Sequence, residues 1–85
     1  MSDPFEEVRT IIVDMMGVEK DTITPNSRFR EDLGADSLDL IEIIIVFEDL
    51  LGMQISDHDM RKIQSTVGEA VQFLKTHRAE ETITE

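Results

Sequence analysis

The chain has 85 residues, with 19 acidic and 8 basic side chains and a formal net charge of −11. It is long enough for one small core and has no cysteine, which excludes disulfides, thiolate metal ligands and a cysteine nucleophile. Its acidity argues against binding to nucleic acid or an anionic membrane and favours partners with basic surfaces, while 40% apolar residues at helical spacing argue against a disordered acidic tail.

The first predicted element is a helix near the N-terminus, indicated by apolar residues three or four positions apart: Phe5, Val8, Ile12 and Met15. Asp3 is expected to cap its first turn, and Gly17 to end it. The sequence does not open with a basic stretch followed by an apolar run, and no apolar run is long enough to span a bilayer. We therefore expect a soluble, cytoplasmic protein that does not contact membranes, and its charge predicts a monomer.

Residues 18–36 combine turn residues with isolated apolar side chains. This pattern predicts a long loop, and we interpret Ile23, Phe29 and Leu33 as its anchors to the core. Loops of this length in compact domains are usually functional or disordered, and the anchors argue against disorder.

A second helix is predicted from Ser37 to Leu51, with Asp36 as its N-cap and Gly52 beyond its end. At about 100° per residue, one broad face should enter the core. That face consists of Leu40, Ile43, Ile44, Phe47, Leu50 and Leu51. A different, apolar strip is bordered by acids and available to a partner; it consists of Leu38, Ile41 and Ile45.

Two capping signatures follow, Ser56 with Asp59 and Thr66 with Glu69. The first predicts a short helix and the second a final helix, in which Gly68 is a mild local weakness. The sequence therefore predicts an all-α fold, a small four-helix bundle of three main helices plus a short third helix, with a long loop between the first and second. We expect one domain over residues 1–78 and a polar, frayed tail over residues 79–85.

Residues 33–39 read LGADSLD, and this string resembles the modification motif of acyl carrier proteins of fatty-acid and polyketide synthesis. The resemblance extends from about Phe5 to Leu74 and implies that Ser37 receives 4'-phosphopantetheine, derived from coenzyme A, from a separate transferase. The terminal thiol of that arm would then hold an acyl group as a thioester. A serine beside a helix start is more often a plain cap, but here Asp36 already fills that role, and the surrounding motif favours modification.

The resemblance also implies partners with basic docking patches: phosphopantetheinyl transferase, acyl-ACP synthase, ketoacyl synthase, acyltransferase and reductase enzymes. Nine carboxylates and no lysine or arginine lie between Arg30 and Arg61. Acids that border an apolar strip suit fast electrostatic steering onto a modest hydrophobic contact. We predict that the partner surface consists of Leu38, Asp39, Ile41, Glu42, Ile45, Glu48 and Asp49.

In this family the core can open to hold the acyl chain, so residues of the predicted core are also candidates for an acyl pocket. These are Leu40, Ile43, Ile44, Phe47, Leu50, Ile63 and Val71. Spacing alone does not separate a packed core from a pocket wall. The chain also departs from many relatives in having bulky Val46 and apolar Leu50, which affects the expected pocket and partner surface.

No catalytic or metal site is predicted, because His58 and His77 lie far apart and show no triad or metal-ligand spacing. Ser37 has no visible general base, so it is expected to be a substrate of another enzyme. Two alternatives to an acyl carrier remain. One is a peptidyl or D-alanyl carrier that uses the same arm, and the other is an unmodified acidic module that binds a partner through its apolar strip.

Overall fold

Helix boundaries in the structure follow the capping residues of the sequence. Asp3 accepts a hydrogen bond from the Phe5 amide, and Gly17 and Gly52 end the first two long helices in the left-handed conformation that glycine adopts without steric cost. The computed structural model describes residues 3–83, which form α1 (Pro4–Met16), a 3₁₀ turn η1 (Lys20–Thr22), α2 (Ser37–Leu51), α3 (Asp57–Ile63) and α4 (Val67–Ile83). Within these residues the only β-structure is an isolated bridge between Arg28 and Thr66, so the predicted all-helical fold is confirmed.

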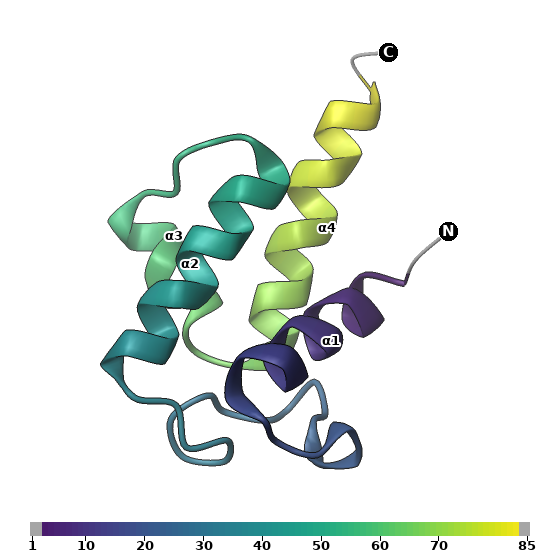
Figure 1. The fold of residues 1–85 in the computed structure, drawn as a ribbon. Helices are drawn as coiled ribbons and strands as arrows, with labels where there is room; N and C mark the ends of the chain where they lie inside the picture. The colour runs from purple at the N-terminus through teal and green to yellow at the C-terminus, as the bar shows by residue number, and fades with distance from the viewer. Residues whose placement is uncertain (1–2, 84–85) are drawn as a thin grey trace.

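Helix α4 is the element on which the other helices assemble. Each of α1, α2 and α3 contacts it. In Figure 1, α1 crosses the lower part of α4, while the short α3 lies on the far side of α2. The core lies between these helices and draws on every one of them. Its largest fully buried side chains are Phe29, Phe47, Ile12, Ile43, Ile63, Leu74, Val8 and Val67.

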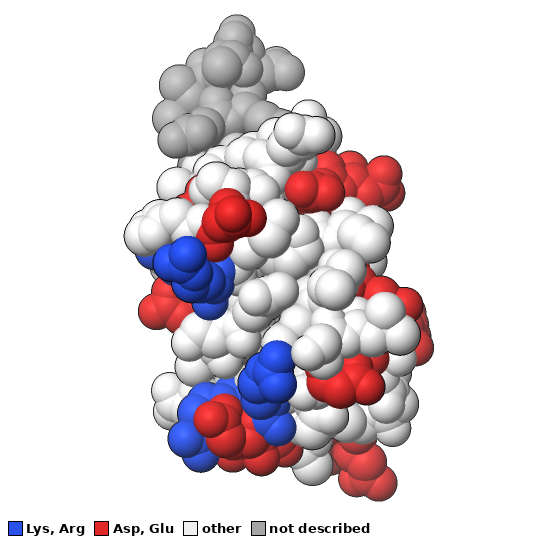
Figure 2. Space-filling view, turned by 90° about the vertical axis from the view of Figure 1, so that its left-hand side faces the viewer, with Lys and Arg blue, Asp and Glu red and all other residues white. Residues whose placement is uncertain are grey.

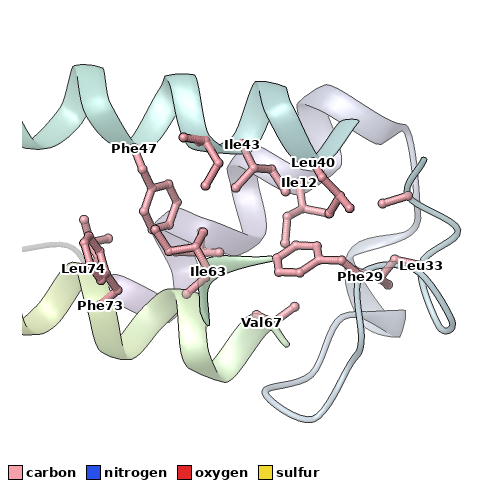
Figure 3. Close-up of a cluster of buried hydrophobic side chains, with 14 of the residues drawn as sticks. Ile12, Phe29, Leu33, Leu40, Ile43, Phe47, Ile63, Val67, Phe73 and Leu74 are labelled. Atoms are coloured by element: carbon pink, nitrogen blue, oxygen red, sulfur yellow. The ribbon is translucent and has the colours of Figure 1, made fainter. Parts of the chain in front are cut away.

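The long loop between α1 and α2 is anchored to the core as predicted. Ile23, Phe29 and Leu33 are only 2%, 0% and 8% exposed. Figure 3 shows Phe29 reaching from the loop into the space between α2 and α4. Burial of three apolar side chains removes them from water and offsets the conformational entropy that ordering so long a loop costs.

Hydrogen bonds between backbones also fix the loop. The first amides of α4 donate to loop carbonyls, Val67 to Ser27 at 2.9 Å and Gly68 to Pro25 at 2.8 Å. A helix start leaves its first N–H groups without intrahelical acceptors, and here the loop supplies them. The loop is thereby attached to α4 and carries the start of α2 to a defined place.

The sequence predicts that Leu50 lies in the core, and the structure corrects this, because its side chain is 42% exposed. Leu50 lies at the edge of the core face of α2, one turn beyond half-buried Val46. Val46 borders an apolar groove of about 270 Å³ between α1 and α2, so no helix covers that edge. Helical spacing defined the face, but the width of the covered part depends on the neighbouring helix.

The C-terminal segment is helical as far as it is described, because α4 continues to Ile83. The segment contains neither glycine nor proline to stop a helix, and alanine and glutamate favour one. Residues 84–85 lie outside the described residues, and the division into a domain over 1–78 and a tail stays a prediction.

Candidate functional site

The start of α2 is capped by carboxylates rather than by the serine. An Asp36 carboxylate oxygen accepts a hydrogen bond from the Asp39 amide at 3.0 Å, and the Asp39 carboxylate accepts one from the Asp36 amide at 3.2 Å. This reciprocal capping box satisfies two amides of the first turn. The assignment of Asp36 as the N-cap is therefore confirmed, and the Ser37 hydroxyl is not needed for capping.

Ser37 is exposed at the first position of α2. Its hydroxyl contacts the loop residue Arg30, whose Nη2 donates to Ser37 Oγ at 3.4 Å. A guanidinium stays charged and cannot accept a proton, so this neighbour does not activate the hydroxyl as a nucleophile. The arrangement fits a serine that another enzyme modifies, with the base supplied by that enzyme.

The position of Arg30 is set by its buried neighbours. Phe29 is fully buried, and its carbonyl accepts a hydrogen bond from the Ala35 amide at 2.8 Å. Ala35 itself is only 5% exposed. This bond folds the loop back on itself, so that Arg30 stands beside the first turn of α2. Sequence reasoning missed the contact because nothing in the local pattern shows how the loop folds back.

The residues around Ser37 fit a phosphate-linked group of the kind the resemblance implies. No acceptor within the described part of the chain takes the amides of Ser37 and Leu38, which lie in the first turn of α2. Such amides, with the positive end of the helix dipole, favour a phosphate. Arg30 adds a cation beside the hydroxyl. The site thus offers an exposed hydroxyl for attachment and positive charge for a phosphodiester.

The apolar strip of α2 faces outward. Leu38, Ile41 and Ile45 are 65%, 53% and 56% exposed. Glu42 and Asp49 are exposed beside this strip. In Figure 2, which displays one side of the molecule, acidic side chains form several groups along the right-hand edge, and others lie on the left beside two basic patches. The predicted strip therefore exists as a surface feature, and its use by partners stays a prediction.

Glu48, a predicted partner residue, has a structural role as well. It is half-buried, and its carboxylate accepts a hydrogen bond from the Ile55 amide at 3.1 Å, which ties α2 to the segment before α3. A second tie runs from the Gln64 side chain to the Leu40 carbonyl at 3.3 Å. Spacing along one helix does not reveal these links, because both join α2 to residues outside that helix.

Most of the predicted core or pocket residues are packed inside. Figure 3 shows several of them meeting side chains of α3 and α4. Val71 is half-buried and packs against the edge of the core. The buried members are Leu40, Ile43, Ile44, Phe47 and Ile63. The structure shows these residues as a core, and their use as an acyl pocket stays a prediction.

Two further observations concern the part of the chain that the structure describes. No helix there has both the length and the apolar composition needed to cross a membrane. The acidic stretch at residues 57–59 belongs to the start of α3, where the Ser56 hydroxyl accepts a hydrogen bond from the Asp59 amide at 3.3 Å. Helix capping therefore accounts for Ser56 and Asp59 as predicted.

Comparison with known proteins identifies the family. Residues 6–74 match the family described as the phosphopantetheine attachment site. The structure is also similar to that of the acyl carrier protein from Enterococcus faecalis, with 35% sequence identity, a TM-score of 0.71, and coverage of 87% of this chain and 92% of that chain. The chain therefore belongs to the phosphopantetheine attachment-site family and has the fold of an acyl carrier protein.

Proposed function

We propose that this chain carries acyl intermediates as thioesters on a 4'-phosphopantetheine arm attached to Ser37 and delivers them to enzymes of fatty-acid or related acyl pathways in the cytoplasm. The observation that supports this most directly is the position of Ser37, exposed at the start of α2 and free of a capping role. The hydroxyl is available to a transferase, and the helix beneath it does not depend on it.

The prosthetic group would supply a thiol, which this chain lacks because it has no cysteine. The residues of the chain would have three tasks. Ser37 provides the oxygen that is linked to phosphorus, and α2 and the loop hold that oxygen at the surface. The apolar strip and its acidic border present the loaded end of the molecule to a partner. No catalytic role is proposed for any residue.

The proposed partners are a phosphopantetheinyl transferase and then acyl-ACP synthase, ketoacyl synthase, acyltransferase and reductase enzymes. Support comes from the strip Leu38, Ile41 and Ile45, which is apolar yet more than half exposed at each position. Acidic neighbours would steer this strip toward basic patches and still permit rapid release, as a carrier that visits several enzymes requires.

The test is the intact mass of the purified chain after incubation with coenzyme A and a broad-specificity phosphopantetheinyl transferase. We expect a gain of one phosphopantetheine in the wild type and none in Ser37→Ala. The variant should keep its stability within about 0.5 kcal/mol, because Asp36 and Asp39 still form the capping box. Circular dichroism and urea denaturation check this. Absence of loading on a folded wild-type chain would favour the unmodified interaction module.

A further inference from the structure

Arg30 is the one cation that the structure places against the attachment serine. Its Nη2 lies 3.4 Å from Ser37 Oγ, although its side chain is exposed and has no carboxylate partner within the described residues. The other nearby arginine is already engaged, since Arg28 Nε lies 3.2 Å from Asp32 Oδ2. Arg30 is therefore a cation held beside the site by the folded loop and still available for an anion.

The charges around this position are otherwise negative. Asp36 and Asp39 cap the helix on either side of Ser37, and Glu31 and Asp32 follow Arg30 in the loop. A phosphodiester on Ser37 would bring one more negative charge into this group. Arginine is well suited to offset it, because its planar guanidinium can donate two parallel hydrogen bonds to a phosphate.

We propose that Arg30 binds the phosphodiester of the prosthetic group on Ser37 and holds the first part of the arm against the loop. This inference rests on the proposed function, because it requires Ser37 to be modified. Arg30 would act as a positioning residue. It would reduce repulsion between the new charge and the acids of the first turn, and it would limit the directions in which the arm leaves the helix.

The test compares apo and loaded forms of the wild type, Arg30→Gln and the matched control Arg28→Gln. Both variants remove one positive charge from the same loop, but Arg28 has no contact with Ser37. Loading is run to completion and verified by intact mass. Urea denaturation then gives the ratio of the folding equilibrium constants of the loaded and apo forms for each chain.

We expect this ratio to be about two- to five-fold lower in Arg30→Gln than in the wild type, as for one exposed ion pair. The control Arg28→Gln should keep the wild-type ratio even though its own stability falls. The difference should shrink at high salt, because the pair is exposed to solvent. Arg30→Lys keeps the positive charge but lacks the planar, two-pronged guanidinium, so its ratio should lie between those of the wild type and Arg30→Gln.

A ³¹P NMR spectrum of each loaded chain provides the second readout. The phosphodiester resonance should shift in Arg30→Gln relative to the wild type and stay in place in Arg28→Gln. The proposal requires both results. If Arg30→Gln and Arg28→Gln respond alike in either measurement while Ser37 is loaded, the role of Arg30 is overturned and the carrier function stands. If the mass shows no loading of the wild type, the carrier function fails, and the role proposed for Arg30 fails with it.

Discussion

The Asp32 carboxylate stabilises the turn that precedes Ser37. One of its oxygens accepts hydrogen bonds from the Arg28 amide at 2.8 Å and from the Arg28 guanidinium at 3.2 Å. The hydrogen bond from the Arg28 amide is the larger cause, and that from the guanidinium the second, of a pKa of Asp32 that lies below its ordinary value. These contacts close the turn between Arg28 and Asp32.

The lowered pKa of Asp32 makes its contribution to stability depend on pH. Because the pKa of Asp32 is lower in the folded chain than in the unfolded one, its stabilising contribution is present at neutral pH and is lost as the pH falls through the folded value. We therefore expect Asp32→Asn to be less stable than the wild type at neutral pH, and we expect this deficit to shrink as the pH is lowered towards about pH 2, below the ordinary pKa of an aspartate. Urea denaturation at both pH values measures this difference.

The matched control for Asp32 is Glu31→Gln, which removes the same charge from the same turn. The Glu31 side chain is exposed and has no hydrogen bond to any residue that the structure describes, so its substitution should change stability little at either pH. If the deficit of Asp32→Asn persisted undiminished in acid, the hydrogen-bonded carboxylate would not be its source.

At the scale of the element, α2 has two apolar sides with different roles. Ile43 is 1% exposed and packs in the core, whereas Ile45 is 56% exposed on the strip. We expect Ile43→Ala to cost about 2–5 kcal/mol of unfolding free energy through lost burial and a cavity. Ile45→Ala should cost no more than about 0.5 kcal/mol.

The same pair of variants separates folding from docking. Ile45→Ala should stay folded and yet be loaded more slowly by the transferase, because the strip is the proposed contact surface. Urea denaturation gives the stability, and the rate of mass gain gives the loading. A folded Ile45→Ala chain that is loaded at the wild-type rate would exclude this residue from the transferase contact.

At Gly68 in α4, contact with the loop is expected to outweigh helix propensity in setting the stability of an alanine variant. Alanine is favoured over glycine inside a helix by about 1 kcal/mol, so sequence rules alone predict that Gly68→Ala stabilises. A Cβ at Gly68 would, however, lie 2.8 Å from the Pro25 carbonyl oxygen, a backbone atom of the loop. We expect a net loss of roughly 1–3 kcal/mol, as for other overpacked sites.

Urea denaturation of Gly68→Ala should be compared with Thr76→Ala, an exposed site on the same helix. Thr76→Ala should be neutral or slightly stabilising, since it improves helix propensity without a clash. An increase in stability for both variants would show that the loop moves away from α4 at little cost.

The sequence predicts the bounds of α2 well because its signals are local. Asp36 and Gly52 act on the turn beside them, so reading them requires no knowledge of the remaining fold. The exposure of Leu50 and the contact between Arg30 and Ser37 depend on where α1 and the loop come to lie. Helical spacing carries no information about such neighbours, and these features therefore needed the structure.

At the scale of the whole molecule, the net charge of −11 shapes how partners find the strip. If acids beside the strip steer docking, Glu42→Lys and Asp49→Lys should reduce kcat/KM for loading by the transferase several-fold at low salt. At about 1 M salt the Debye length is near 3 Å, and the loss should be largely removed. Loading rates across a salt series test this.

The control for charge reversal is Asp21→Lys, an exposed acid in η1 and outside α2. It changes the net charge by the same amount as each α2 variant. Because Asp21 lies outside α2, its reversal should slow loading less than either α2 variant does at low salt. Equal losses for all three variants would mean that total charge, and not the acidic border of the strip, governs recognition.

The hydrogen bonds that join the loop to α4 also determine when, during synthesis, the loop can take its final shape. Val67 and Gly68 donate to Ser27 and Pro25, and the whole of α2 and α3 lies between the two groups in the chain. Such contacts form only after a long segment has closed, which makes them late events in folding. On the ribosome, the loop beside Ser37 would therefore lack its final shape until the start of α4 has emerged. If Ser37 is modified as proposed, we expect modification to be efficient only after the start of α4 has been made.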